Sequence, residues 1–307
     1  MEQSPVANAD RVVILVNPHA GSASAFARVE RLSSLLKQRG IMAEVHTDLA
    51  EAIARAETWH QAGCLRVLVG VGGDGTAAEL VNRTSPGMPI TMLPAGTENL
   101  LARHFGLHHS PDALCQTILD GQLLPVDAGL ASGRIFLVMA SCGFDAAVVE
   151  RVHGQRHGHI HKWTYLKPIA ESMWRYSFPQ IRVQLSDQST ALAVHWLFAF
   201  NLPCYGGGFR LAPHADSADG LFDVCMYRGR TLWRGLLFAL AAGCRKHSML
   251  ANFSTLRSPR LRLESDEPVP YQLDGDPGGY LPLELETLPG RLLLLVPKKK
   301  EEGRETR

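Results

Sequence analysis

The chain has 307 residues, and 46% of them are hydrophobic, so it is long enough for two modest domains with separate cores. A formal net charge of +1, from 31 Lys and Arg against 30 Asp and Glu, argues against nucleic-acid binding through a broad basic surface. The polar N-terminal segment differs from a signal peptide, and the longest apolar stretches are too short to span a bilayer. We therefore expect any membrane contact to be peripheral, and six scattered cysteines without a CxxC pair indicate the reduced thiols of a cytoplasmic protein.

The first third of the chain alternates between strand-like and helix-like segments. Strands are expected at residues 11–16, 43–46, 66–71 and 89–93, and helical spacing of apolar residues is found at 26–36, 49–62 and 77–82. Strands that alternate with helices indicate an α/β domain, in which helices cover both faces of a parallel sheet. Ligands of such sheets bind beyond the carboxyl ends of the strands.

Beyond about Asp120, most segments are strand-like and are separated by turn signals. The expected strands are 124–130, 134–140, 181–185, 194–201, 221–227, 261–264, 271–273, 283–286 and 292–296, with helical stretches only near 162–175 and 232–245. This profile predicts an antiparallel, β-rich second domain. We expect the first domain to cover 1–125, the second to cover 126–297, and a charged, disordered tail to cover 298–307.

Three glycines surround one acid in Gly72-Gly73-Asp74-Gly75-Thr76, between an expected strand and an expected helix. Glycines let a backbone approach a ligand closely, and the amides that begin the following helix attract an anion. Thr76 can donate to a phosphate, and Asp74 can hold Mg²⁺ directly or through water. The simpler alternative is a tight turn with a capping Asp.

Two more loops follow strands of the same expected sheet. Asn17-Pro18-His19-Ala20-Gly21 follows the first strand, and the segment 94–103, which contains Gly96-Thr97-Glu98-Asn99, follows the fourth. Either loop alone is weak evidence, because such residues also mark ordinary loops and helix caps. The three loops together are informative, since all of them would open on one edge of the sheet.

With these loops the chain resembles the diacylglycerol kinase family, which includes sphingosine kinases, ceramide kinases and bacterial lipid kinases. The resemblance extends to the segment 216–224 and to Asp274-Gly275-Asp276, and so covers about residues 11–297. The glycine-rich loop is shared with NAD kinases and phosphofructokinases, whereas the other segments favour the lipid kinases. The resemblance implies a three-layer α/β domain followed by a β-sandwich, with the active site in the cleft between them.

The resemblance also implies roles for individual residues. Asp276 would be the general base, and Asp74 would be a second catalytic carboxylate. Mg²⁺ would bind Asp216, Asp219 and the carbonyl of Leu221, and Asp127 would belong to the catalytic Mg²⁺ network. The residues that match the family's ATP-binding segments are Asn17, Pro18, His19, Ala20, Gly21, Thr47, Gly72, Gly73, Asp74, Gly75, Thr76, Ala77, Ala78, Gly96, Thr97 and Asn99.

Two positions depart from the pattern of the family. The base is usually Glu, and Asp276 is one methylene shorter. An Asp that helps to organise the metal usually follows the Asn of the third loop, where this chain has Leu100. From these departures we expect either weaker binding of the catalytic metal ion or a shifted position of the site.

Two further features have a simple and a functional interpretation. The histidines 153, 157, 159 and 161 lie among basic residues, and a basic loop that meets anionic headgroups is favoured over a metal site, because no Cys or carboxylate accompanies them. The apolar residues of 232–246, which Arg245 and Lys246 follow, could lie on a membrane, but packing on the second domain is the favoured interpretation.

The sequence thus predicts an ATP- and Mg²⁺-dependent lipid kinase that phosphorylates a hydroxyl of a lipid such as diacylglycerol or a sphingoid base. One alternative is an NAD kinase-like enzyme that uses the same loop on a small molecule. Another is a non-catalytic protein that binds lipid or nucleotide, for which Leu100 and Asp276 are the only support. The acceptor lipid is left open, and so is the oligomeric state, including a homodimer.

Overall fold

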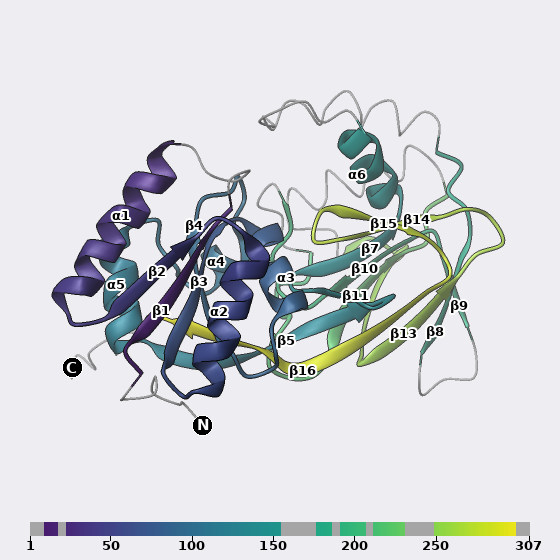
Figure 1. The fold of residues 1–307 in the computed structure, drawn as a ribbon. Coiled ribbons are helices and arrows are strands. Elements are labelled where there is room, and N and C mark those ends of the chain that lie inside the picture. The colour runs from purple at the N-terminus through teal and green to yellow at the C-terminus, as the bar shows by residue number, and fades with distance from the viewer. Residues whose placement is uncertain are drawn as a thin grey trace, which may run out of the picture. The chain divides into compact units, whose positions relative to one another are not determined.

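A computed structural model describes residues 9–17, 23–154, 176–185, 191–206, 211–230 and 249–298. The chain divides into two compact units, which are coloured along the sequence in Figure 1. The described residues up to Val126, with those from Arg291 onward, form the first unit, and Asp127–Gly290 forms the second. The expected helices near 162–175 and 232–245, and the tail beyond residue 298, lie outside the described residues.

The first unit is an α/β fold around a parallel sheet, as predicted. Its strands stand in the order β2-β1-β3-β4, and all of the pairings are parallel. The elements are β1 (Arg11–Val16), α1 (Ala23–Gln38), β2 (Met42–His46), α2 (Leu49–Gln61), β3 (Leu65–Gly72), α3 (Asp74–Arg83), β4 (Pro89–Pro94), α4 (Leu100–His104) and α5 (Pro111–Asp120). Each expected strand agrees with the observed one to within one residue at either end.

Helices cover both faces of this sheet because alternate side chains of a strand point to opposite faces. On one face, Ile14 of β1 and Val69 of β3 share a buried cluster with Leu32 of α1 and Ile118 of α5. On the other face, Gly70 of β3 leaves room for α3, since a Cβ there would lie 2.7 Å from Cδ1 of Leu80. Helix α2 also contacts β1 and β3.

The second unit is built from antiparallel sheets. One has the strand order β12-β11-β10-β7-β14-β15, and in the other β16 pairs with β13, β13 with β8, and β8 with β9. Strand β5 (Gln122–Ala131) begins in the first unit and continues into the second, and β16 (Leu283–Val296) ends in the first. The other elements of the second unit are β6 (Arg134–Phe136), β7 (Met139–Gly143), α6 (Phe144–Gly154), β8 (Ile181–Leu185), β9 (Leu192–Val194), β10 (Trp196–Phe200), β11 (Phe222–Tyr227), β12 (Phe253–Ser258), β13 (Arg260–Glu264), β14 (Pro270–Leu273) and β15 (Asp276–Tyr280).

The two sheets of the second unit pack face to face as a sandwich, because one buried cluster contains side chains from both sheets. Leu197 of β10 and Val224 of β11 come from the first sheet, and Val183 of β8 and Leu261 of β13 come from the second. The rings of Phe136 and Phe222 stack within this cluster with centroids 5.7 Å apart. The predicted class of the second domain, a β-sandwich, is confirmed.

The C-terminal strand differs from the sequence analysis. Residues 283–286 and 292–296, expected as two strands of the second domain, form the single strand β16. From Arg291 onward this strand belongs to the first unit, where Leu293 and Leu294 pair in parallel with Pro89 and Ile90 of β4. A pairing across about 200 residues leaves no local signal in the sequence.

Within the described part of the chain, no helix combines the length and apolar character that a membrane crossing requires.

Candidate active site

The first and second glycine-containing loops meet at the carboxyl edge of the parallel sheet. The backbone N–H of Asn17 donates to the carbonyl of Val71 at 3.3 Å, and the Asn17 side chain donates through Nδ2 to Oγ1 of Thr76 at 3.1 Å. The end of β1 is therefore tied to the start of α3. Pro18, His19, Ala20 and Gly21, which were expected to complete the first loop, lie outside the described residues.

The second and third loops are joined by Asp74. Its two carboxylate oxygens accept from the backbone N–H groups of Leu100 and Leu101, each at 2.9 Å, so Asp74 caps the start of α4. Burial raises the pKa of the Asp74 carboxyl, and these N–H groups oppose the rise. The capping role that was the simpler alternative for Asp74 is thus present, although it spans two loops.

Glycines allow the same two loops to touch through their backbones. A Cβ on Gly96 would lie 2.7 Å from the Cα of Gly73 and 2.9 Å from Oδ1 of Asn99, closer than real side chains approach. The Asn99 side chain accepts from the N–H of Gly96 at 2.9 Å and donates to its carbonyl at 2.8 Å. Asn99 is buried and has a φ of +50°, a conformation that Asn tolerates better than most residues. Its side chain therefore shapes the loop.

Open space remains beside Gly75. A Cβ built there meets no atom within 4 Å, although Gly73 and Gly96 on either side of the loop junction are crowded. Gly75 and Thr97 are exposed, whereas Thr76 is buried. The arrangement is a closed backbone framework with one accessible glycine at the start of α3.

Three other expected ATP-binding residues have different surroundings. Ala77 and Ala78 are buried in the first turns of α3, where they pack in the core. Thr47 is exposed and follows β2, which is separated from β3 by β1 in the sheet order. Ala77 contacts the second loop directly, since its backbone N–H donates to the carbonyl of Gly73 at 3.2 Å.

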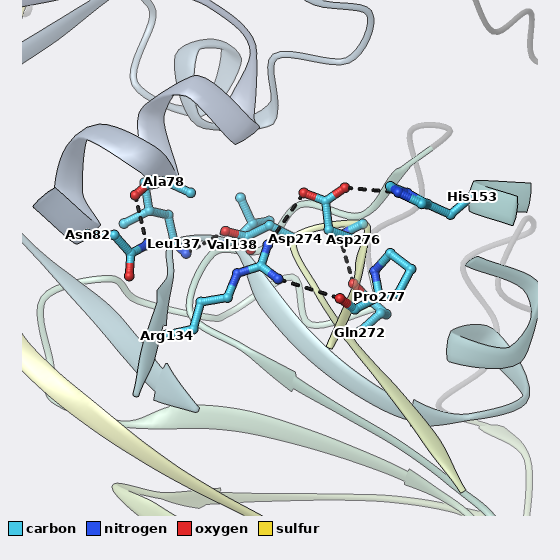
Figure 2. A network of polar contacts seen from close by, with 11 residues as sticks. Ala78, Asn82, Arg134, Leu137, Val138, His153, Gln272, Asp274, Asp276 and Pro277 are labelled. Atoms are coloured by element: carbon cyan, nitrogen blue, oxygen red, sulfur yellow. Dashed lines mark hydrogen bonds and ion pairs between the residues drawn. The ribbon is translucent and has the colours of Figure 1, made fainter. Parts of the chain in front are cut away.

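In the second unit, the Asp274-Gly275-Asp276 turn connects β14 to β15. Asp274 has a φ of +52° and Gly275 a φ of +89°, so two successive residues are left-handed. The Asp274 carboxylate accepts from three backbone N–H groups of the segment that leads into β7, those of Leu137 at 2.7 Å, Val138 at 2.8 Å and Met139 at 3.0 Å. Asp274 therefore fixes the turn (Figure 2).

Asp276 points its carboxylate toward two basic side chains, as Figure 2 shows. One oxygen lies 3.5 Å from a guanidinium nitrogen of Arg134, and the other lies 4.0 Å from Nδ1 of His153 in α6. All three side chains are between one third and one half exposed. The Asp276 carboxylate is therefore partly accessible to solvent and lies beside the Arg134 guanidinium.

The expected metal ligands occupy two different environments. Asp127 is buried, and its carboxylate accepts from the N–H groups of Gly220 and Gly290, each at 2.7 Å. Asp216 and Asp219 lie in a turn in which each accepts from the N–H two residues later, at 3.1 Å to Ala218 and 3.0 Å to Leu221.

Arg257 neutralises part of this acidic turn, because a guanidinium nitrogen lies 3.2 Å from Oδ2 of Asp219 and another lies 3.4 Å from Asp223. Among the described residues, no group of three or more His, Cys, Asp or Glu side chains is arranged to hold a metal ion. Carbonyl oxygens such as that of Leu221 would have to complete a site at Asp216 and Asp219.

The sequence analysis missed a buried polar cluster in the second unit. Asp145, in the first turn of α6, is buried and contacts Ser141, Tyr205 and Gln272. Burial raises the pKa of the Asp145 carboxyl, and the three hydrogen bonds oppose the rise. The available signal was a lone acid in the otherwise uncharged segment from Ala140 to Val149.

Comparisons with known proteins match both units. Residues 11–131 match the diacylglycerol kinase catalytic domain, and residues 138–296 match the YegS C-terminal NAD kinase beta sandwich-like domain. A diacylglycerol kinase of Mycobacterium tuberculosis is 30% identical to this chain, over 94% of this chain and 96% of the relative. A diacylglycerol kinase of Bacillus subtilis is 25% identical, over 95% and 98%.

Solved structures show the same fold. A diacylglycerol kinase from Bacillus anthracis has a TM-score of 0.68 at 17% identity, covering 94% of this chain and 98% of that chain. An NAD kinase from Archaeoglobus fulgidus, crystallised with ATP, has a TM-score of 0.53 at 11% identity and covers 94% of each chain. The structural likeness supports the fold, the sequence matches span both units, and the chain belongs to the diacylglycerol kinase family of lipid kinases.

Proposed function

We propose that this lipid kinase is ATP- and Mg²⁺-dependent and transfers the γ-phosphate to a hydroxyl of a lipid such as diacylglycerol or a sphingoid base. The observation that carries the proposal is the junction of three loops at one sheet edge. There Asn17 is bound to Thr76, and Asp74 is bound to the start of α4. Such an edge is where parallel sheets bind their ligands.

The residues present fit a chain of phosphates. Gly73 and Gly96 bring two backbones together so closely that neither position has room for a side chain without adjustment. Helix α3 begins at Asp74, and beside it a Cβ on Gly75 would meet open space. Anionic groups bind well at a helix N-terminus that glycines leave accessible. The first unit is therefore proposed as the nucleotide-binding domain.

Asp276 is proposed as the general base of the second unit. In the proposed step, the hydroxyl oxygen of the lipid forms a bond to the γ-phosphorus, and the bond from that phosphorus to the bridging oxygen breaks. The bridging electron pair leaves with ADP, and the proton of the hydroxyl passes to a carboxylate oxygen of Asp276. Arg134 would hold the carboxylate in place for this transfer.

The acidic residues named from the sequence are proposed to organise Mg²⁺. Carboxylate and carbonyl oxygens are the ligands that this ion prefers, and Asp216, Asp219 and the Leu221 carbonyl supply them on one short turn. When bound near phosphates, Mg²⁺ neutralises their charge. Asp74 and Asp127 would act in the same network, although each carboxylate already accepts hydrogen bonds from backbone N–H groups.

An apolar acceptor would reach the enzyme at a membrane surface, so peripheral membrane contact is part of the proposal. His153 is the described member of the histidine cluster, and it lies beside Asp276. The other three histidines lie outside the described residues.

The fold likeness to an NAD kinase supports one competing acceptor, NAD itself. The two are separated by incubating the purified protein with Mg-ATP and either NAD or mixed micelles of diacylglycerol or a sphingoid base, and by measuring ADP and phosphorylated product. Lipid phosphate formed without NADP supports the proposal. NADP as the only product contradicts it, and ATP binding without any turnover would favour a non-catalytic protein.

A further inference from the structure

The buried cluster around Asp145 connects three separate segments of the second unit. Oδ2 of Asp145 accepts from Oγ of Ser141 on β7 and from Nε2 of Gln272 on β14, the latter at 3.2 Å. Oδ1 accepts from the hydroxyl of Tyr205, which follows β10. Ser141 and Gln272 are direct partners across the β7–β14 pairing, so the cluster rests on the sheet itself.

These contacts fix the orientation of the Gln272 amide. Its Nε2 donates to Oγ of Ser141 at 2.9 Å and to Asp145 at 3.2 Å, so Oε1 is directed away from the acid. That oxygen accepts from the backbone N–H of Gly275 at 2.7 Å. A rotation of the amide by half a turn would set Nε2 against the Gly275 donor and Oε1 against the Asp145 oxygen. Asp145 therefore determines that the oxygen of the Gln272 amide, and not its nitrogen, faces the N–H of Gly275.

Gly275 belongs to the turn that carries Asp276. Two successive residues there, Asp274 and Gly275, are left-handed, a combination that local sterics do not favour for the Asp. The turn is held from one side by the Asp274 carboxylate and from the other by Gln272. Leu273 pairs with Asp276 across the turn, so any movement of Gly275 shifts the residue that follows it.

We propose that Asp145 and Gln272 are positioning residues, which act through the N–H of Gly275 to hold the carboxylate of Asp276 where it accepts the substrate proton. The proposal rests on the proposed role of Asp276. Burying an acid costs stability unless each of its oxygens is hydrogen-bonded, and here three donors satisfy it. A placement error of about 1 Å at a reacting group can cost about 10²-fold in rate, which is the scale of effect such residues control.

Gln272→Glu tests the chain of contacts. The new carboxylate has no proton to donate to Asp145, and repulsion between the two adjacent acids displaces it from the N–H of Gly275. We expect kcat to fall by about 10²-fold while the KM for ATP stays within about twofold. When Asp145→Asn is combined with Gln272→Glu, the acid and the amide exchange positions, so that the Asn side chain donates to the Glu carboxylate. The double variant should recover at least about tenfold in kcat over Gln272→Glu alone.

A second readout does not depend on activity. Hydrogen exchange of the segment that contains Gly275 and Asp276 should be faster in Gln272→Glu and slow again in the double variant, because the N–H of Gly275 loses and regains a fixed acceptor. If wild type phosphorylates no lipid but exchange follows this pattern, the proposed function fails and the positioning contact stands. If exchange is unchanged, the positioning contact is wrong whatever the activity.

Matched controls are Gln184→Glu on β8 and Asp266→Asn, whose side chain pairs with Arg182, because both are exposed positions of the same unit. Both should leave kcat unchanged. If Gln272→Glu does not fold, Ser141→Ala removes one contact of the amide and should lower kcat in the same direction by a smaller factor. Folded variants with wild-type kcat, or a double variant no better than Gln272→Glu, would overturn the proposal.

Discussion

Leu100 donates its backbone N–H to the carboxylate of Asp74 at 2.9 Å. Asp74 belongs to the second glycine-containing loop, so this contact ties that loop to the start of α4, the helix that follows the third loop. The resemblance implied an Asp at the position of Leu100, and in this chain the position contributes through its backbone. Asp74 therefore combines a structural contact with a proposed role at the phosphates, and the two roles must be separated by experiment.

Asp74→Asn should remain folded and lose activity. The Asn retains one acceptor oxygen, but its NH₂ group faces the N–H of Leu100 or Leu101, which costs about 1–3 kcal/mol of stability. Loss of the charge should lower kcat by about 10²-fold or more. The control is Asp48→Asn, which alters the cap of α2 and should lower the melting temperature slightly without reducing kcat. Wild-type turnover by Asp74→Asn would remove Asp74 from the site.

The Gly75→Ala variant tests whether the loop at Gly75 binds phosphates or is an ordinary turn. A Cβ at Gly75 meets no atom within 4 Å, so the melting temperature should stay within a few degrees of wild type. If phosphates occupy that space, the KM for ATP should rise about tenfold or more. Gly96→Ala instead forces Gly73 away and should lower stability as well. Calorimetric titration with ATP and thermal melts distinguish the two, and unchanged ATP affinity in Gly75→Ala would indicate a plain turn.

Asp276→Asn should lower the single-turnover rate by about 10²–10⁴-fold and leave ATP affinity nearly unchanged. Asn fills the same space but accepts no proton at neutral pH. Asp276→Glu keeps a carboxylate at the position and should retain much of the activity. The turn-capping role belongs to Asp274, whose carboxylate accepts from Leu137, Val138 and Met139, so loss of folding is not expected at 276. A rate equal to wild type in Asp276→Asn would assign the base to another group.

Arg257 provides a test of the proposed Mg²⁺ site, since its guanidinium competes with a cation for Asp219 at 3.2 Å. Arg257→Gln should tighten Mg²⁺ binding, and Asp219→Asn should weaken or abolish it. The measurement is the increase in melting temperature on adding Mg²⁺ without nucleotide. Equal increases in wild type and both variants would place the ion elsewhere.

The buried acid Asp145 predicts a pH-dependent difference in stability. Its pKa is raised by burial, so the folded chain keeps a proton that the unfolded chain loses at about pH 4. The folded state then binds more protons than the unfolded state, and stability attributable to this group falls as pH rises through that window. Urea unfolding of wild type and Asp145→Asn from pH 4 to 7 should show wild type losing stability relative to the variant. A constant difference would contradict the raised pKa.

The sequence predicts the parallel sheet well because β1, β3 and β4 are short apolar runs that end at or close to a glycine or proline. Arg11–Val16 was expected with the observed bounds, and the three loops could be placed at one edge from strand order alone. Helix α5 and helix α6 were not foreseen, and neither were β12 and β15. Strand β15 begins at Asp276 and contains Pro277, Gly278 and Gly279, residues that usually argue against a strand.

The site was predictable where chemistry is local and unpredictable where it depends on distant contacts. The glycine loops carry their signal in five consecutive residues. Asp145, in contrast, acquires its surroundings from Gln272, which is 127 positions away, and from Tyr205, which is 60 positions away. Asn99 was expected to bind nucleotide, but its bonds to Gly96 show a structural role that no spacing rule reveals.

The most direct test of the central claim is transfer of an ¹⁸O-labelled γ-phosphate from ATP to a lipid extract in the presence of Mg²⁺, followed by mass spectrometry. The account predicts a labelled lipid phosphate with wild type, and at least about 10²-fold less of it with Asp276→Asn under the same conditions. Wild type that forms no labelled lipid, or equal amounts from the two proteins, would contradict it.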